Sequence, residues 1–302
     1  MTGFGLAYVA LATKDVAAAS RVLGELLELP RQDLRFAGST APCFAIGETA
    51  LALFTPDDPF LGAGAQPGVH HVAFAAEDPA RAGAALSQSG FATSTAPGGA
   101  MALDPAQTSG VRVRLSPALR MGVGRSGWVD RIDHIGIASA DNQAAIATFC
   151  QRLGCPLESQ QTDMEVQIAV ESFTSDRYGV VYHTRPPVPV GGLRVAFITT
   201  GDCELEFLQN FDPAQSGQVA HGTSGNTRQD QGAIARFVAS RGAGLHHIAF
   251  KSRDIDRTLA HLHAAGLPMI DLKGRPGSRR AKIGFCHPQA MGGVLIHVVE
   301  RD

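Results

Sequence analysis

Four short stretches of this chain share one alternating pattern of apolar and polar positions. Starting at Leu6, Gly68, Ile132 and Gly244, they read LAYVALA, GVHHVAF, IDHIGIA and GLHHIAF. Alternation with a period of two predicts a half-buried strand, because successive side chains point to opposite faces. Each stretch is followed by an acidic turn and a run with helical spacing. The chain therefore contains an internal repeat of strand, turn and helix in four copies.

An aspartate stands at the start of each predicted helix, where its side chain can accept hydrogen bonds from the free N–H groups of the first turn. These four residues are Asp15, Asp78, Asp141 and Asp254. We expect the helices to end near Leu29, Gln88, Leu153 and Ala265. Short apolar runs after each helix predict further strands, which makes the repeating unit a βαβββ module.

Four such modules, paired two by two, predict an α+β fold of two domains, each a curved mixed sheet around a cleft. The equivalent positions Tyr8, His71, His134 and His247 are 63, 63 and 113 residues apart, so the third module is about 50 residues longer than the first two. We place the extra residues in an insertion at about 166–189 and in a polar, glycine-rich loop at about 212–231. The predicted domains are residues 1–118 and 131–302, and a linker spans residues 119–130.

The two faces of the predicted first strands differ in the size of their side chains. One face holds large apolar residues and should pack on the helices, whereas the other is small and leaves room for a cleft. The four cleft-facing positions hold Tyr8, His71, His134 and His247. Strict alternation would place His246, beside His247, on the packed face.

The last strand of each module can be aligned in the same way, and its cleft-facing positions hold Ala52, Arg114, Glu206 and His297. A single histidine in a strand is more often structural than a metal ligand, but four donors at equivalent repeat positions are hard to attribute to chance. The C-terminal domain thus has a predicted site for a divalent metal (Zn, Co, Mn, Ni or Fe). Its ligands are His134, Glu206, His247 and His297. The N-terminal domain cannot hold a metal with the side chains at its four positions.

Composition narrows the function classes. With 302 residues, 44% apolar and 18% charged, the chain is an ordinary globular protein, and its net charge of −2 argues against nucleic acid as a partner. No apolar run is long enough to predict a membrane span. Five cysteines without a CxxC pair and an N-terminus without a signal sequence favour a cytoplasmic location.

The paired modules with cleft-facing histidines resemble the vicinal oxygen chelate superfamily, which includes glyoxalases, extradiol dioxygenases, bleomycin-resistance proteins and methylmalonyl-CoA epimerases. The resemblance to methylmalonyl-CoA epimerase is strongest over residues 232–300, in GAIARFVASRGAGLHHIAFKSRDID and GFCHPQAMGGVLIHVVE. It implies the same four ligands, but His297 stands where the family has a glutamate. The strand LRVAF, residues 193–197, has no acid at the place of the epimerase's general base.

The resemblance implies a divalent-metal-dependent isomerase, epimerase or lyase that stabilises an enolate of a carbonyl or acyl substrate. The alternative enzyme is a non-haem iron dioxygenase of the extradiol or hydroxyphenylpyruvate type, with iron held by His134, His247 and Glu206. A third class is a metal-free protein that binds small molecules, of the bleomycin-resistance kind. The expected partners are a small-molecule substrate, with acyl-CoA or a vicinal-oxygen compound as candidates, and a second copy of the chain in a homodimer.

Two further pairs of residues are candidates for catalysis and substrate binding. Tyr182 and His183 lie in the insertion, which we expect to border the cleft, so either could act as the general base. An ordinary extra hairpin is the simpler interpretation of the same residues. Arg279 and Arg280, in the basic loop GRPGSRRAK, could bind a phosphate or carboxylate of the substrate, or could simply be solvated.

Overall fold

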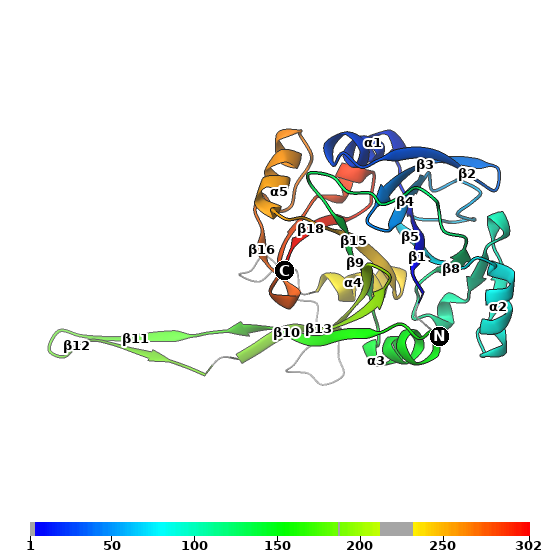
Figure 1. Cartoon of the computed structure of the whole chain (residues 1–302). Helices are drawn as coiled ribbons and strands as arrows, with labels where there is room; N and C mark the ends of the chain where they lie inside the picture. The colour runs from blue at the N-terminus through cyan, green and yellow to red at the C-terminus, as the bar shows by residue number, and fades with distance from the viewer. Residues whose placement is uncertain (1–3, 187, 212–231) are drawn as a thin grey trace.

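The two halves of the chain form two eight-stranded mixed sheets (Figure 1). The computed structural model describes residues 4–186, 188–211 and 232–302. The sheets curve and carry few helices, which confirms the predicted α+β fold of paired βαβββ modules. The predicted glycine-rich loop at 212–231 lies outside the described residues.

The N-terminal sheet has the strand order β2-β3-β4-β1-β5-β8-β7-β6. Its strands are β1 (Leu6–Ala12), β2 (Arg31–Phe36), β3 (Ser39–Ile46), β4 (Thr49–Phe54), β5 (Gly68–Ala75), β6 (Thr93–Thr95), β7 (Met101–Leu103) and β8 (Val113–Ser116). The two first strands, β1 and β5, pair antiparallel at the centre, and each pairs parallel with the last strand of its own module.

The C-terminal sheet repeats this topology with the order β10-β13-β14-β9-β15-β18-β17-β16. Its strands are β9 (Arg131–Ala138), β10 (Leu157–Gln167), β13 (Val188–Thr200), β14 (Cys203–Phe211), β15 (Gly244–Lys251), β16 (Arg275–Pro276), β17 (Lys282–Phe285) and β18 (Ile296–Glu300). Between the two sheets, residues 117–130 contribute one isolated bridge, from Gly124 to Gly47.

Four helices begin directly after the predicted aspartates, and a fifth, at Ala233–Arg241, was not predicted from the sequence. They are α1 (Val16–Ser20) with its π-helical continuation η1 (Arg21–Leu26), α2 (Pro79–Gln88), α3 (Asn142–Ile146) with η4 (Ala147–Arg152), α4 (Ala233–Arg241) and α5 (Ile255–Ala264). The four predicted aspartates each cap a helix, accepting from the N–H groups of Ala18, Arg81, Gln143 and Arg257 at 2.8–2.9 Å. Four 3₁₀ turns complete the helices: η2 (Pro97–Gly99), η3 (Pro105–Gln107), η5 (Ser278–Arg280) and η6 (Pro288–Met291).

The large apolar face of the central strands is fully buried, as predicted. The residues on it are Val9, Leu11, Val72, Phe74, Ile135, Ile137, Ile248 and Phe250, all with no exposed surface. They belong to one apolar cluster that includes residues of both halves. The opposite, small face of each sheet is therefore the one left for a site.

Two β-bulges interrupt the central pair of strands in each half. In the C-terminal half the extra residues are Asp133 of β9 and His246 of β15, which have no partner in the register between the strands. In the N-terminal half they are Ala7 and His70, at the equivalent positions. A bulge places two residues of one strand opposite one residue of the other and so breaks the alternation of faces. The bulges lie next to the four cleft-facing positions predicted from the sequence.

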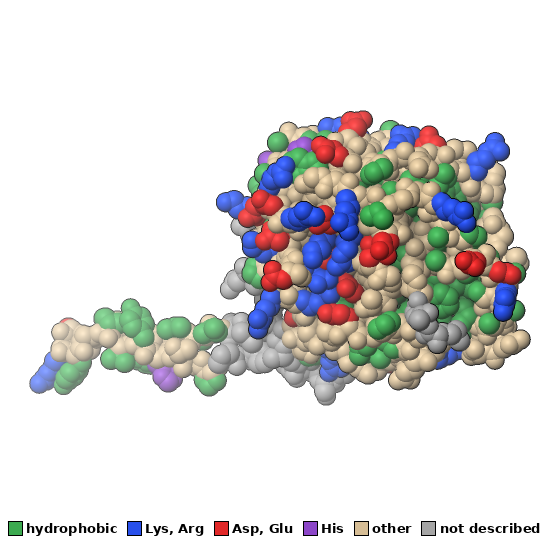
Figure 2. Space-filling model, in the orientation of Figure 1, with side chains coloured by type: hydrophobic (Ala, Val, Ile, Leu, Met, Phe, Trp, Pro, Cys, Tyr) green, Lys and Arg blue, Asp and Glu red, His purple; other side chains and the backbone are tan. Residues whose placement is uncertain are grey.

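The insertion of the third module contains a separate hairpin. Among the described strands, β11 (Val170–Ser175) and β12 (Gly179–Thr184) pair only with each other, and they project from the body as an arm (Figure 1 and Figure 2). The arm exposes more than half of the surface of several large apolar side chains, and these are Val170, Phe173, Tyr178, Val180, Val181 and Tyr182. Among the described residues, no helix has the length and apolar character needed to cross a membrane.

Candidate metal centre

Four neighbouring strands of the C-terminal sheet bring the four predicted ligands together. His134, Glu206, His247 and His297 come from β9, β14, β15 and β18, which are adjacent in the order β14-β9-β15-β18. The register explains why they converge: Gly136 is paired with both Glu206 and His247, and Ala249 is paired with both His134 and His297. All four side chains are buried.

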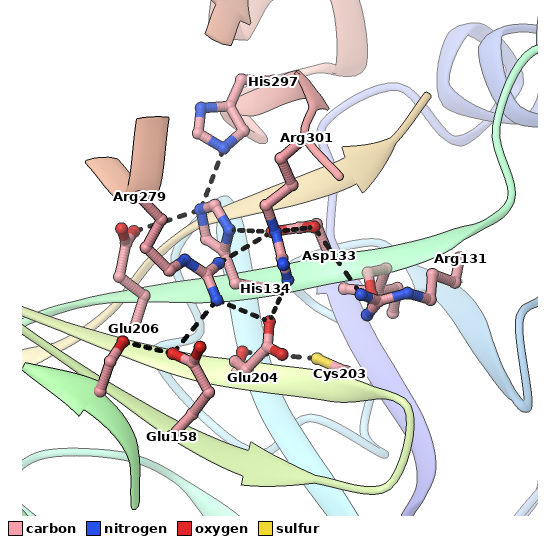
Figure 3. A network of polar contacts seen from close by, with 12 residues as sticks. Arg131, Asp133, His134, Glu158, Cys203, Glu204, Glu206, Arg279, His297 and Arg301 are labelled. Carbon is pink, nitrogen blue, oxygen red and sulfur yellow. Dashed lines mark hydrogen bonds and ion pairs between the residues drawn. The ribbon is translucent and has the colours of Figure 1, made fainter. Parts of the chain in front are cut away.

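The donor atoms of these residues face one another. Glu206 Oε2 lies 3.2 Å from His134 Nε2 and 3.5 Å from His247 Nε2, and His134 Nε2 lies 3.1 Å from His297 Nε2. The ligand atoms of the three histidines all lie within 4.8 Å of one another. Figure 3 shows His134 between Glu206 and His297.

This arrangement fits a divalent transition metal. Two ligands at about 2.0–2.1 Å from one ion, at tetrahedral or octahedral angles, are roughly 2.8–3.4 Å apart, which is close to the observed separations. In addition, His247 Nε2 and His297 Nδ1 are buried without a hydrogen-bond partner. Because buried polar atoms are nearly always satisfied, the unpaired His247 Nε2 beside a carboxylate points to a missing partner at the centre of the cluster.

A glycine makes room for this cluster. A Cβ atom at Gly136 would lie 2.0 Å from His247 Cε1, well inside van der Waals contact. The imidazole of His247 therefore occupies the space above the neighbouring strand where any other residue would have a side chain.

Asp133 supports the first ligand. Its Oδ1 lies 2.9 Å from His134 Nδ1, which leaves His134 Nε2 directed at the cluster. A carboxylate that holds the far nitrogen of a ligand histidine fixes its tautomer and ring orientation. Asp133 was not predicted from the sequence, because strict alternation places it on the face opposite His134. The bulge at Asp133 removes that restriction.

Asp133 is in turn held by two arginines (Figure 3). Arg279 donates to its Oδ1 at 3.1 Å and Arg301 to its Oδ2 at 2.9 Å, and both arginines also pair with Glu204. Burial would raise the pKa of Asp133, but the hydrogen bond from His134 and the nearby positive charges outweigh it and lower the pKa to about 2. The carboxylate is thus held in its ionised form.

The electrostatics of the cluster differ from one histidine to the next. Burial would lower the pKa of His134, but the charge of Glu206 and the hydrogen bonds to Asp133 and Glu206 outweigh it and raise the pKa to about 9. Burial lowers the pKa of His247 and, together with the neighbouring histidines, holds that of His297 well below its usual value. His134 and Glu206 thus form an ion pair, flanked by two neutral imidazoles.

His246 does not lie simply on the packed face, as strict alternation predicted. Its Nδ1 lies 2.9 Å from the Nδ1 of His247, and its ring meets the edge of Phe237 in α4. Burial, with the neighbouring His247, lowers the pKa of His246 to about 3. The bulge is the reason for the difference, since it lets two consecutive residues border the same cavity.

A cavity of about 240 Å³ opens beside the four ligands. Most of its wall is apolar, including Phe197, Leu208 and Ile283. Asp163 of β10 adds a carboxylate, which accepts hydrogen bonds from Ser278 Oγ at 2.8 Å and from the side-chain amide of Gln161. Asp163 was not among the residues predicted from the sequence. It lies opposite Leu193, so the acid that is absent from LRVAF is found on the adjacent strand.

The other predicted site residues differ in whether they line the cavity. Tyr182 and His183 lie on the exposed arm and do not line the cavity, so the expectation that their segment borders the cleft is not met; the insertion forms a separate hairpin instead. Arg279 lines the cavity, and its guanidinium lies over the ring of Phe197, 3.5 Å from the centroid. Arg280 is exposed and does not line the cavity.

The N-terminal half brings its own four equivalent positions together without forming a metal site. Tyr8 Oη lies 3.3 Å from His71 Nε2, and the register pairs Ala52 with Ala10 and Arg114 with Ala73. Of the described residues, only His134, His247 and His297 form a group with metal-ligand spacing.

Comparison with known proteins agrees with this geometry. Residues 133–286, just over half of the chain, match the family described as the Glyoxalase/Bleomycin resistance protein/Dioxygenase superfamily. The chain belongs to this superfamily. The resemblance inferred from the repeated modules is thereby confirmed, and members of the superfamily include both epimerases and dioxygenases.

Two proteins similar in sequence and one solved structure of similar fold stand for what the chain resembles. The chain is 26% identical over 172 residues to the uncharacterized protein YqjC of Bacillus subtilis, a match that covers 57% of this chain and 93% of the relative. It is 24% identical over 173 residues to an ethylmalonyl-CoA/methylmalonyl-CoA epimerase of Cereibacter sphaeroides, a match that covers 56% of this chain and 97% of the relative. A mutant of 4-hydroxymandelate synthase from Streptomyces coelicolor shares the fold over 100% of this chain and 94% of its own, with a TM-score of 0.62 and 14% identity.

Proposed function

We propose that this protein is a divalent-metal-dependent isomerase, epimerase or lyase that removes a proton next to the carbonyl group of its substrate. The convergence of His134, Glu206, His247 and His297 beside a small apolar cavity supports this proposal above all. These four residues would hold the metal. When bound, the metal would act as a Lewis acid toward a carbonyl oxygen and stabilise the negative charge that develops there.

Asp163 is the residue that we propose as the general base. Among the described residues, two carboxylates line the cavity: Asp163 and Glu206, which belongs to the ligand cluster. The hydrogen bonds from Ser278 and Gln161 fix its orientation while leaving it in the wall of the cavity. A positioned carboxylate of this kind could accept the proton α to a carbonyl and return it to the same or the opposite face.

An acyl-CoA thioester is the substrate class that we favour. A groove of about 1220 Å³ between the two halves is bordered by the basic side chains of Lys14, Arg236 and Arg241. It also shares His246 and Leu295 with the wall of the metal cavity. Basic residues at the mouth would attract the phosphates of CoA, and the acyl group would reach the ligands. The epimerase relative acts on compounds of this class by its name.

The second candidate is a non-haem iron dioxygenase. Its specific support is the donor set, because two histidines and one carboxylate on neighbouring strands also suit Fe(II). His134, His247 and Glu206 would then be the ligands, and His297 would be a neighbouring acid or base.

The test is the metal content of the protein purified without chelators, compared with His247→Ala and His71→Ala. His71 is the matched control, since it occupies the equivalent strand position in the half that lacks the other ligands. We expect about one divalent metal in the wild type and in His71→Ala, and a large loss in His247→Ala. Absence of metal from the wild type, or equal metal in all three, would overturn the site.

Solvent exchange distinguishes the two enzyme classes. For the proposed class, a panel of acyl-CoA thioesters in D₂O should include one that gains deuterium at its α-carbon. Asp163→Asn should abolish this exchange while the metal content stays the same. Iron in the purified protein, with oxygen uptake on catechols and no deuterium exchange, would instead favour the dioxygenase.

A further inference from the structure

The N-terminal half has a buried arginine at the position where the C-terminal half has its last ligand. Arg114 of β8 is paired with Ala73 of β5, just as His297 of β18 is paired with Ala249 of β15. Only 8% of Arg114 is exposed. Its Nη2 atom donates to the carbonyl oxygen of Phe60 at 2.9 Å, whereas its Nη1 atom is buried without a hydrogen-bond partner.

The guanidinium of Arg114 is not paired with an acid in the part of the chain that the structure describes. Among the described residues, none forms a salt bridge with Arg114. The guanidinium lies against the ring of Phe60, 4.7 Å from the centroid. Burial lowers the pKa of Arg114; Tyr8 opposes this effect and the second arginine, Arg112, adds to it. A buried charge without a counter-ion is unfavourable, so an anion bound here would stabilise the guanidinium.

A cavity of about 450 Å³ lies in contact with this arginine. Leu61, Leu103 and Val113 give it apolar walls, and Arg112 adds a second, exposed cation. The adjacent acid, Asp104, is exposed and accepts a hydrogen bond from the backbone N–H of Ala106. The volume falls within the range of about 300–1,000 Å³ that is usual for small-molecule sites.

The two histidines in the wall add hydrogen-bonding groups rather than charge. Burial, together with nearby Arg112 and Arg114, lowers the pKa of His70 to about 3, and burial with the charge of Arg114 holds that of His71 well below its usual value. The buried positive charge of the cavity is thus that of Arg114. One negative charge would neutralise it, which favours a carboxylate over a phosphate dianion.

We propose that the cavity of the N-terminal half binds a small organic carboxylate, with its carboxylate group paired to Arg114 and its hydrocarbon part against Leu61, Leu103 and Val113. The equivalent strand positions of the two halves then serve ligands of opposite charge: a metal cation in one half and a carboxylate anion in the other. This site is separate from the metal cavity, because no residue lines both, although it shares His70, Pro105 and Arg112 with the groove between the two halves.

Calorimetric titration of the full chain with acetate, propionate and benzoate, and with inorganic phosphate for comparison, tests the proposal. We expect saturable binding of propionate or benzoate that is tighter than that of phosphate, and at least tenfold weaker binding in Arg114→Met. His247→Ala should bind the carboxylates as the wild type does, which separates this site from a carboxylate bound at the metal centre. Binding lost in His247→Ala but retained in Arg114→Met would overturn the proposal.

Two further variants keep the test decisive if Arg114→Met does not fold. Arg114→Lys retains the charge without the planar fork, so it should weaken carboxylate binding and not abolish it. Ser94→Trp fills the cavity from an exposed position of its wall and should abolish binding while the buried charge is unchanged. No saturable carboxylate binding in the wild type, phosphate bound more tightly than every carboxylate, or unchanged binding in Ser94→Trp would each contradict the proposed site.

Discussion

The carboxylate of Asp133 lies 2.9 Å from the Nδ1 atom of His134, its direct neighbour in the chain. A bulge in β9 permits this contact between consecutive strand residues. The contact orients the imidazole so that its Nε2 atom points into the cluster, 3.2 Å from Glu206 Oε2.

Asp133→Asn should weaken metal binding by about 10–100-fold, as is usual when the carboxylate behind a ligand histidine is lost. Competition with a chromophoric chelator measures the metal affinity of each variant. Glu204→Gln is the control, because the side chain of Glu204 pairs with the same two arginines, Arg279 and Arg301. Although Glu204 and His134 are partners in the strand register, no side-chain hydrogen bond or ion pair joins them in the described structure. An equal loss of affinity in both variants would show that the arginine network as a whole, and not the contact with His134, supports the site.

Gly136→Ala should displace the ring of His247, because the new Cβ would lie 2.0 Å from its Cε1. We expect a loss of most metal affinity and of about 1–3 kcal/mol in the free energy of unfolding, the usual cost of overpacking. Chemical denaturation and metal analysis of the same preparation measure both effects. Gly5→Ala, where a Cβ meets no atom within 4 Å, should change neither. Normal metal content in Gly136→Ala would argue against His247 as a ligand.

Arg279 and Arg280 should differ sharply in their importance although they are neighbours with nearly the same backbone conformation, φ of 56° and 57°. Arg279→Met removes a cation from Asp133 and Glu204, and we expect a loss of a few kcal/mol. This is at the low end of the ~3–5 kcal/mol for breaking a buried ion pair, because Arg301 still contacts both acids. Arg280→Met should stay within about 0.5 kcal/mol, as is usual for exposed residues. Equal effects in urea unfolding would contradict the network shown in Figure 3.

Removal of the β11–β12 arm should leave the metal centre intact. Replacing residues 168–187 by Asn-Gly would join Gln167 to Val188, which already pair in β10–β13, through a turn suited to a two-residue hairpin. The metal content should be unchanged, and the stability should change little because the arm pairs with neither large sheet.

The same deletion shows whether Tyr182 and His183 have any catalytic part. If the shortened chain binds metal normally but loses α-deuterium exchange, the arm contributes to the reaction. The point variants Tyr182→Phe and His183→Ala would then identify the residue responsible. Full activity in the shortened chain is what we expect, since both side chains are exposed and absent from the wall of the cavity.

The repeat made the fold and the four converging positions predictable from the sequence. Alignment of the modules depends only on alternation and spacing, and it selected His134, Glu206, His247 and His297, which the strand register then brings together. Asp133 and the position of His246 could not be found in this way. They depend on bulges, which are a property of how two strands pair and leave no local signal in either strand.

The other features of the site that the sequence could not predict depend on contacts between distant segments. Asp163 reaches the cavity because β10 pairs with β13, and Ser278, which holds it, comes from a turn 115 residues later in the chain. Arg279 and Arg280 cannot be told apart in the sequence of the basic loop. The turn at η5 directs Arg279 to a buried ion pair with Asp133 and leaves Arg280 exposed. Tyr182 and His183 failed to meet the cavity because the insertion forms a sheet of its own.

Gly136 also marks a difference between the two halves. Its counterpart in the N-terminal sheet is Ala10, which is paired with His71 and Ala52 as Gly136 is with His247 and Glu206. Replacing Tyr8, Ala52 and Arg114 by metal ligands would therefore leave a methyl group at the position that corresponds to Gly136, over which the ring of His247 lies. A second metal centre in this chain would need a fourth substitution, Ala10→Gly, to make room for the imidazole.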